Sequence, residues 1–320
     1  MRELIDNIFI RHLGNPELNT KLDAALMEIP DGDHELLIST DSFTVQPLEF
    51  PGGCIGSLAV HGTINDLAVS GARGLYMTLN VILEEGLEIK LLDRVINQLA
   101  LAATQANVRI IAGDTKVVAR GECDGMYLAT TGVGLRDKNQ KLGTDLIQHG
   151  DAILVSGSVG DHGAAVMLAR EQFGLSGKLD SDSANVFPLT NSLSDIEGLR
   201  FMRDPTRGGL ATVLHEISAT TDLGINIIES SIPILEQVES VCEILGYNPL
   251  YLACEGRVVA VVNPDDAPRA LELWKSVEGG EDAAIIGYVE SEHNHVILQS
   301  RLGGEKFLEE LEDEPLPRIC

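Results

Sequence analysis

The first half of the chain alternates between hydrophobic patterns typical of helices and patterns typical of strands. Segments in which apolar residues recur with helical spacing are 3–12, 64–72 and 88–105. Segments rich in apolar and β-branched residues, which predict strands, are 35–39, 76–83, 108–112 and 125–135. This order predicts an α/β domain in the first half.

A polar stretch at 136–150, with glycines at its end, predicts a domain boundary. Beyond it the pattern predicts strands at 152–156, 225–228 and 258–262 and near Ile285 and Val296, and helices at 162–173, after Gly209 and at 267–277. Residues 176–186 are polar and predict a mobile loop. The acidic, proline-containing residues 309–320 predict an extended, solvated arm. We therefore expect domains at 1–140 and 150–304 and a flexible tail at 305–320 that carries Cys320.

Composition and charge exclude several classes of protein. The 320 residues are 44% hydrophobic and 22% charged, which is typical of a globular chain. Lys and Arg number 23 against 49 Asp and Glu, and the net charge of −26 disfavours nucleic acid and membrane surfaces as partners. The sequence has no apolar run long enough to cross a membrane and no signal peptide, so we expect a cytoplasmic protein. Its five cysteines lack C-x-x-C spacing, which argues against a disulfide framework and a zinc site.

Several acidic residues stand at the ends of apolar segments and are candidate magnesium ligands. Asp41 and Asp114 each follow a predicted strand, and Asn65-Asp66 lies near a helix start. Carboxylates on rigid elements suit Mg²⁺, with phosphate oxygens filling the remaining positions. Each of these residues, taken alone, is more often a turn residue or helix cap. The usual phosphate-loop and dinucleotide-binding motifs are absent, so a nucleotide site must be built in another way.

Two further charged residues are candidates for chemistry. Lys116, close to Asp114, could neutralise a transferring phosphate, although a solvated surface lysine is the commoner case. Glu255 precedes an apolar strand and could be a site carboxylate or a strand-edge charge; the pattern leaves this open. Residues 204–209 precede a helix and fit an anion site or an N-cap equally well.

Cys320 is the most unusual residue of the sequence. It follows an acidic, proline-stiffened spacer that could span roughly 25 Å when extended. A thiolate on such an arm is a nucleophile that could carry a covalent group between sites. The alternative is an incidental cysteine on a disordered tail, but an exposed thiol is a liability in a soluble protein. We therefore expect a functional thiol.

Taken together, these segments resemble the HypE family of hydrogenase maturation proteins. The segments that carry the resemblance are Ser39-Thr40-Asp41-Ser42, Pro51-Gly52-Gly53, Asn65-Asp66 with Ala68-Val69-Ser70-Gly71-Ala72, Gly113-Asp114-Thr115-Lys116-Val117-Val118, Gly160-Asp161-His162-Gly163, Thr206-Arg207-Gly208-Gly209 and Pro317-Arg318-Ile319-Cys320. Most of them are general features of an ATP-binding superfamily that includes aminoimidazole ribonucleotide synthetase, selenophosphate synthetase and thiamine monophosphate kinase. The Pro-Arg-Ile-Cys terminus is specific to the HypE family.

The resemblance implies a fold and a set of ligands. The fold is α+β, with the two-domain architecture of aminoimidazole ribonucleotide synthetase: an N-terminal ATP-binding α/β domain that forms a homodimer through its sheet, and a C-terminal α+β domain. ATP and Mg²⁺ are the implied cofactors. The residues implied at the nucleotide are Asp41, Asn65, Asp66, Gly113, Asp114 and Thr115, of which Asp41, Asp66 and Asp114 approach the metal.

The resemblance also implies a reaction. A carbamoyltransferase, HypF, places a carbamoyl group on Cys320, ATP phosphorylates the carbamoyl oxygen, and loss of phosphate leaves a thiocyanate. Lys116 is assigned to charge stabilisation and Glu255 to proton removal, which requires both to lie within reach of Cys320. The cyano group then passes to a HypC and HypD complex for nickel-iron hydrogenase.

One departure from the family and two alternatives remain. Family members carry a glycine-rich segment ahead of the first helix, which here starts almost at Met1, so we expect either a trimmed chain or weaker ATP binding.

A small-molecule kinase or synthetase of the same superfamily would explain the acidic motifs but not Cys320. A non-catalytic thiol carrier or scaffold would leave Lys116 and the acidic motifs without a purpose.

Overall fold

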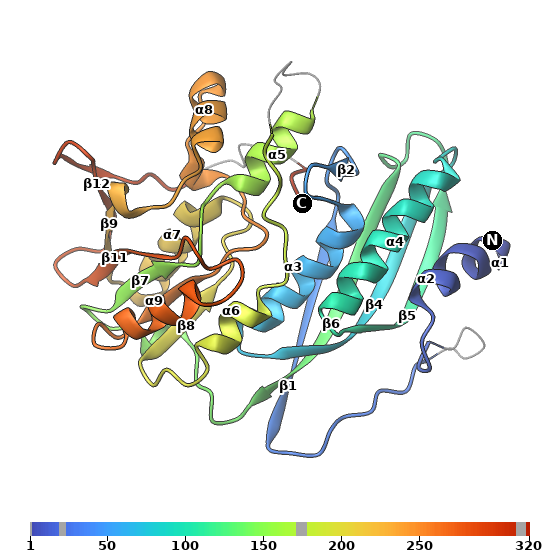
Figure 1. The fold of residues 1–320 in the computed structure, drawn as a ribbon, viewed down its shortest axis with the longest axis horizontal. Coiled ribbons are helices and arrows are strands. Elements are labelled where there is room, and N and C mark those ends of the chain that lie inside the picture. The colour runs from blue at the N-terminus through green and yellow to red at the C-terminus, as the bar shows by residue number, and fades with distance from the viewer. Residues whose placement is uncertain (1, 19–23, 171–177, 312–317) are drawn as a thin grey trace.

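The computed structural model describes residues 2–18, 24–170, 178–311 and 318–320, and its two halves pack side by side (Figure 1). The first half begins with one continuous helical segment, as the sequence predicts for residues 3–12. It comprises α1 (Arg2–Leu4), the π-helical η1 (Ile5–Ile10) and α2 (Arg11–Leu13).

The first half is built on a four-stranded sheet with the order β1-β6-β4-β5. Its strands are β1 (His34–Phe43), β4 (Arg73–Glu84), β5 (Arg109–Val118) and β6 (Met126–Asp137), and only β4 and β5 are parallel. Helices α3 (Ile55–Val69) and α4 (Ile89–Gln105) cover one face, after the small hairpin β2 (Glu49–Phe50) and β3 (Gly53–Cys54) (Figure 1). The predicted stripe of α4 is buried against this layer, which confirms that helix.

The opposite face of this sheet carries exposed hydrophobic side chains. Leu36 and Ile38 on β1 and Ile82 on β4 are 55%, 73% and 38% exposed. The strand pairing places Val133 opposite Ile38, and Tyr127 opposite Ile82. Because side chains alternate between the two faces of a strand, these residues share the side away from α3 and α4. We call it the open face.

The second half is built on a seven-stranded sheet with the order β13-β12-β9-β11-β7-β10-β8. Its strands are β7 (Ala152–Val155), β8 (Leu199–Arg203), β9 (Gly224–Ile228), β10 (Val259–Val262), β11 (Ala284–Glu290), β12 (Val296–Gln299) and β13 (Glu305–Phe307). Its helices are α5 (Asp161–Ala169), α6 (Phe187–Ser192), α7 (Gly209–Thr221), α8 (Glu236–Leu245) and α9 (Ala267–Lys275), with short 3-10 helices η2 (Thr144–Leu146), η4 (Glu229–Ser231) and η5 (Pro249–Tyr251). Successive residues of β7 and β10 enter two separate hydrophobic clusters, so both faces of this sheet are covered.

Several elements differ from the sequence predictions. The helix predicted at 64–72 begins nine residues earlier, at Ile55, because α3 is buried on nearly every side and has no polar stripe to mark it. Helix α5 ends at Ala169, and residues 171–173 of the predicted helix lie outside the described residues. The elements β8, α6 and α8 were not predicted.

The predicted flexible tail, residues 305–320, is wrong at both of its described ends, whereas Glu309 and Glu310 at the start of the predicted solvated arm are exposed. Residues 305–307, which we assigned to the tail, pair with β12 as β13, and Leu308 beyond them is buried. Residues 312–317 lie outside the described residues. Ile319 is 3% exposed and belongs to a hydrophobic cluster to which both halves of the chain contribute, so the end of the chain is docked rather than solvated.

Candidate functional site

A cavity of about 190 Å³ lies where β1 and α3 meet the second half of the chain. Its lining includes four predicted site residues, Asp41, Asp66, Glu255 and Cys320. The other lining residues are Thr40, Gly62, Arg203, Asp204, Thr206 and Arg207. Residues more than 250 positions apart in sequence therefore share one small space.

Two of the carboxylates come from the first half. Asp41 lies on the covered side of β1, and Asp66 lies near the end of α3, where its Oδ2 accepts a hydrogen bond of 2.6 Å from Ser39 Oγ. Gly62, one turn before Asp66 on α3, lets the helix approach β1: a Cβ there would lie 2.8 Å from the Phe43 ring and 3.5 Å from Asp41. This close packing holds Asp41 and Asp66 on adjoining surfaces.

Burial and neighbouring negative charge raise the pKa values of Asp204 and Asp41 in this cavity. Burial, and then the neighbouring Asp66 carboxylate, raise the pKa of Asp204 to about 7. Burial and Asp66 also raise the pKa of Asp41. Arg203 and Arg207 supply positive charge at the same cavity. A cation bound in this cavity would stabilise the ionised forms of these carboxyl groups.

Glu255 is buried in the loop before β10, and its pKa is raised well above the usual value by burial and then by Asp182 and Asp204. Its Oε1 has no hydrogen-bond partner within the described part of the chain. The Asp182 carboxylate accepts hydrogen bonds from the backbone N–H groups of Glu255 and Gly256, at 3.1 to 3.2 Å. The side chain of Glu255 is therefore free to act in the cavity while its backbone is fixed.

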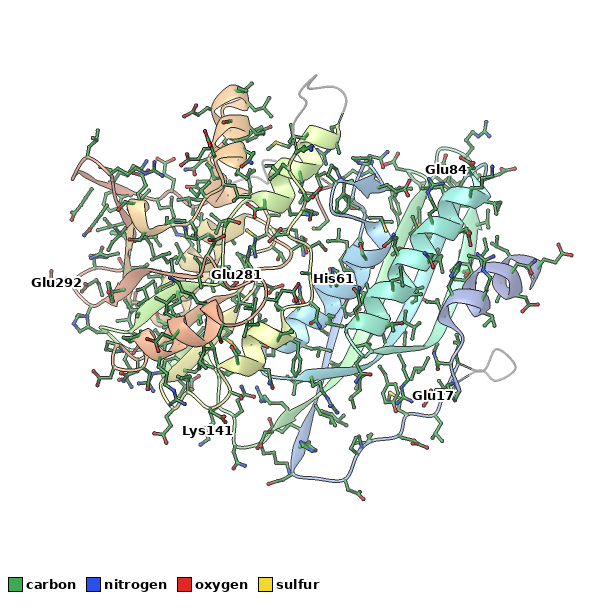
Figure 2. The ribbon with its side chains drawn as sticks, in the orientation of Figure 1. Glu17, His61, Glu84, Lys141, Glu281 and Glu292 are labelled. Atoms are coloured by element: carbon green, nitrogen blue, oxygen red, sulfur yellow. The ribbon has the colours of Figure 1, made fainter. Side chains whose placement is uncertain are left out.

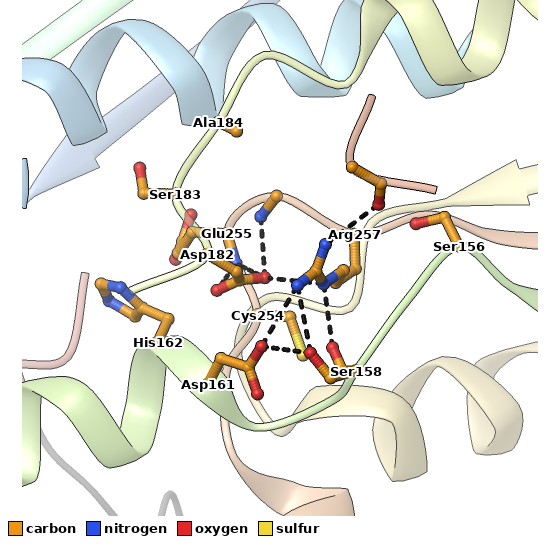
Figure 3. Close-up of polar contacts among 12 residues, drawn as sticks. Ser156, Ser158, Asp161, His162, Asp182, Ser183, Ala184, Cys254, Glu255 and Arg257 are labelled. Atoms are coloured by element: carbon orange, nitrogen blue, oxygen red, sulfur yellow. Dashed lines mark hydrogen bonds and ion pairs between the residues drawn. The ribbon is translucent and has the colours of Figure 1, made fainter. Parts of the chain in front are cut away.

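Behind Glu255 lies a buried network of charges (Figure 3). The Arg257 guanidinium donates to Asp161 and to Ser158 and forms an ion pair with Asp182 at 3.6 Å. Burial raises the pKa values of both Asp161 and Asp182. One guanidinium thus neutralises the two carboxyls nearest to the Glu255 loop.

The end of the chain is held in place mainly through its backbone. Each of its last three carbonyl groups accepts a hydrogen bond: the oxygen of Cys320 from Thr44 N–H at 2.9 Å, and that of Arg318 from Gln46 N–H at 3.2 Å and from Arg170 at 2.8 Å. The Arg318 side chain pairs with Asp124. These contacts place Cys320 at the cavity.

The third carbonyl, that of Ile319, lies 2.8 Å from His162 Nε2. Burial lowers the pKa of His162 to about 4, so its ring is neutral near pH 7. A carbonyl oxygen can only accept, so Nε2 carries the proton, and Nδ1 accepts from Ser181 Oγ at 2.8 Å. His162 is thus a fixed donor to the tail, a role that the sequence did not predict.

The remaining predicted residues do not reach this cavity within one chain. Lys116 Nζ pairs with Asp114 Oδ2 at 3.0 Å, and both side chains are well exposed. They lie opposite Ile82 and Asn80 of β4, which places them on the open face of β5, at the edge farthest from β1. Gly113 and Thr115 belong to the same strand.

Asn65 is committed to structural contacts. Its Nδ2 donates to the carbonyl oxygens of Ala184 and Glu255 at 2.9 and 3.0 Å, and its Oδ1 accepts from Val186 N–H at 3.0 Å. The side chain is 1% exposed. A direct contact with a nucleotide would require these bonds to break, so the structure argues against the predicted role of Asn65.

A second cavity of about 290 Å³ adjoins the first. The two share Asp66, Arg203 and Asp204, and the second is otherwise lined by Leu37, Ile38, Ser39, Leu67, Val69 and Ser70. Arg203, the last residue of β8, was missed because β8 itself was not predicted, whereas Asp204 begins the 204–209 motif that the sequence marked as an anion site or an N-cap. The second cavity therefore combines apolar residues with polar and charged ones beside the charged first cavity, which suits a ligand that carries both a ring and an anionic end.

The described residues hold neither a membrane-spanning helix nor a ready-made cluster of metal ligands. Among the described residues, none of the helices combines the length and the apolar character needed to span a bilayer. In the same residues no three His, Cys, Asp or Glu side chains are arranged to hold a metal ion by themselves.

Known proteins resemble the chain over its whole length. Residues 21–136 match the family of AIR synthase related protein, N-terminal domain, and residues 148–299 the corresponding C-terminal domain. Carbamoyl dehydratase HypE of Azotobacter vinelandii is 42% identical over 100% of this chain and 94% of its own length.

Solved structures agree. Hydrogenase maturation protein HypE in complex with ATP superposes with a TM-score of 0.94 at 42% identity, covering 100% of this chain and 96% of that one. HypE in a HypE-HypF complex gives a TM-score of 0.83 at 41% identity, covering 98% and 99%. These likenesses confirm the predicted family and the two-domain α+β fold, and the chain therefore belongs to the HypE family of carbamoyl dehydratases.

Proposed function

We propose that this enzyme dehydrates an S-carbamoyl group on Cys320 to a thiocyanate at the expense of ATP, for nickel-iron hydrogenase maturation. The observation that carries this proposal is the presence of Cys320 in one cavity with Asp41, Asp66 and Glu255. A superfamily kinase needs no thiol there, and a non-catalytic carrier needs no carboxylates.

The proposed reaction has two steps. The carbamoyl oxygen attacks the γ-phosphorus of ATP and ADP leaves, which converts a poor leaving group into a phosphate. One N–H proton is lost as the phosphorylated imidate forms, and a base then removes the second N–H proton while the C–O bond breaks, so phosphate departs and a carbon–nitrogen triple bond remains. We assign proton removal to Glu255, whose raised pKa makes its ionised form a stronger base than an exposed glutamate.

The nucleotide is proposed to bind across the two adjoining cavities. HypE, 42% identical to this chain, was solved with ATP, and the larger cavity has both apolar residues that could contact a base and polar residues that could contact a ribose. Asp41 and Asp66 would hold Mg²⁺, which commonly binds through one or two carboxylates and the phosphates of its nucleotide. Bound there, the metal would neutralise charge on the phosphates.

In a homodimer, the site of one subunit would be completed by four β5 residues of the other: Gly113, Asp114, Thr115 and Lys116. The exposed hydrophobic residues of the open face suggest that a second copy covers it. Thr40, which alternates onto that face, also lines the Cys320 cavity at the β1 edge, so the cavity borders the proposed contact. Lys116 at the same contact could stabilise phosphate charge in the other subunit.

The proposed partners and compartment follow from the family. A HypE was solved bound to HypF, which supports a HypF-type carbamoyltransferase as the donor of the carbamoyl group. A HypC and HypD complex is proposed as the acceptor of the cyano group. Five free cysteines are compatible with the reducing cytoplasm.

Mass spectrometry of the C-terminal peptide tests the reaction. After incubation with the carbamoyltransferase, Cys320 should gain a carbamoyl group, and on addition of Mg-ATP it should lose the mass of one water. The Cys320→Ser variant is the control and should show neither change. ATP hydrolysis without modification of Cys320 would favour the kinase, and no ATP consumption at all would favour the carrier.

A further inference from the structure

Residues 181–186, here called the strap, run between the two halves of the molecule and contact both. Asn65 on α3 holds the strap at Ala184 and Val186. His61, which faces the second half from near the centre of the molecule (Figure 2), lies 3.0 Å from Ser183 Oγ through its Nδ1. The sequence predicted a mobile loop here, but the strap is tied down along its length, so that prediction is wrong for 181–186.

The strap also holds the loop that carries Glu255. The carboxylate of Asp182 accepts from two consecutive backbone N–H groups, and Ala184 N–H points to the Glu255 carbonyl oxygen at 3.4 Å. A Cβ on Gly256 would lie 1.8 Å from the carbonyl oxygen of Asp182, so only glycine permits this approach. Asn65 Nδ2 donates to the same Glu255 carbonyl from the other side.

At its other end the strap reaches the docked tail. Ser181 Oγ–H is the donor that fixes the neutral tautomer of His162, and His162 in turn donates to Ile319. Ser181 N–H donates to the Pro51 carbonyl oxygen at 2.9 Å, next to Gly52, where a Cβ would lie 2.6 Å from Ser181 N. Ser181 thus supports His162, which holds the tail that carries the thiol, and the next residue, Asp182, supports the loop of the proposed base.

We propose that the strap is a positioning element, which sets Glu255 against Cys320 through Asp182 on one side and the Ser181–His162 pair on the other. The proposal rests on the role of Glu255 in the proposed function. Neither Asp182 nor Ser181 lines the cavity, so each acts through another residue. A proton transfer depends on the distance between base and substrate, and a shift of about 1 Å can cost about 100-fold in rate.

Two variants test the two ends of the strap. Asp182→Asn keeps the shape but replaces one acceptor oxygen with an NH₂ group and removes the charge that pairs with Arg257, and it should lower the turnover of dehydration at least tenfold while KM for ATP stays within twofold. Ser181→Ala removes the donor to His162, and carboxypeptidase should then remove Cys320 about fivefold faster, the effect of losing one hydrogen bond to a buried group. Ser183→Ala is the matched control: Ser183 lies in the same segment, and within the described residues its side chain bonds to His61 and not to the Glu255 loop or the tail, so this variant should match the unaltered protein in both assays.

The outcomes separate this proposal from the proposed function. The carboxypeptidase assay needs neither ATP nor a carbamoyl group, so it reports on the strap even if the unaltered protein does not dehydrate Cys320. That failure would count against the proposed function alone. Release of Cys320 from Ser181→Ala at the rate of Ser183→Ala would overturn the proposal, as would an Asp182→Asn variant with full turnover. If Asp182→Asn does not fold, the Ser181→Ala result decides.

Discussion

Replacing Ile319 with alanine should release residues 318–320 from their docked position without unfolding the protein. Ile319 is 3% exposed, so the change removes three carbon atoms from an almost fully buried side chain. At about 0.8 kcal/mol for each carbon, docking should weaken by about 2.4 kcal/mol, or about 50-fold in the docking equilibrium. The carbonyl groups that bond to Thr44, Gln46 and His162 belong to the backbone and remain available.

Amide hydrogen exchange at Thr44 and Gln46 measures this equilibrium. Their N–H groups donate to the carbonyl oxygens of Cys320 and Arg318, so docking protects them. When closing is faster than exchange, the exchange rate is proportional to the undocked fraction. We expect exchange at both amides to accelerate by up to about 50-fold in Ile319→Ala. The Ile55 amide, which donates to the Leu48 carbonyl oxygen, should keep its rate.

The matched control is Ile244→Ala on α8, where the same atoms are removed from a side chain that is 66% exposed. It should leave the exchange of Thr44 and Gln46 unchanged. If these amides in Ile319→Ala exchange within twofold of the unaltered protein, burial of Ile319 does not hold the tail and the reasoning is refuted.

Glu255→Gln should slow dehydration about 100-fold or more while carbamoylation of Cys320 continues, as followed by the mass of the C-terminal peptide; unchanged dehydration would remove Glu255 from the mechanism. Asn65→Ala should lower the free energy of unfolding by about 3 kcal/mol in a urea titration, because three hydrogen bonds of about 1 kcal/mol each are lost, and an unchanged midpoint would contradict this. The pKa of His162 is about 4 in the folded protein, below its usual 6.5, so its contribution to stability is present above pH 6.5 and is lost as the pH falls toward 4. His162→Gln should therefore lose less melting temperature between pH 7 and pH 5 than the unaltered protein, and equal losses would disprove the assignment. Ile38→Glu should convert the proposed homodimer to a monomer in light scattering, and a dimeric variant would show that the open face is not the contact.

The elements that the sequence predicted well are those buried on one side. Helix α4 has a clear apolar stripe, and β6 alternates between buried and half-buried positions. Helix α3 is buried on nearly every side and contains glycines at positions 56 and 62, so its first nine residues gave no periodic signal. Periodicity shows which face is buried only when another face is not.

The residues of the candidate site also divide into those that the sequence could indicate and those that it could not. Residue types and positions made Asp41, Asp66 and Cys320 candidates. The pattern left Glu255 open and the family resemblance added it, and the fold brings all four together. Asp114 and Lys116 carried an equally good motif, but which face of β5 they occupy depends on strand pairing, which the sequence does not reveal. His162 and Asp182 act by accepting or donating to backbone groups distant in sequence, and such contacts leave no local pattern.

The site that holds residues 318–320, here called the groove, is formed by residues of both halves of the chain. This has a consequence for the order of folding. Thr44 and Gln46 on one wall belong to the first half of the chain, and His162 and Arg170 on the other wall belong to the second. The groove exists only after each half has folded and the two have met, so residues 318–320 can dock only as a late event. Any change that loosens the contact between the halves should free the thiol before it unfolds either one, which makes the state of Cys320 a sensitive reporter of assembly.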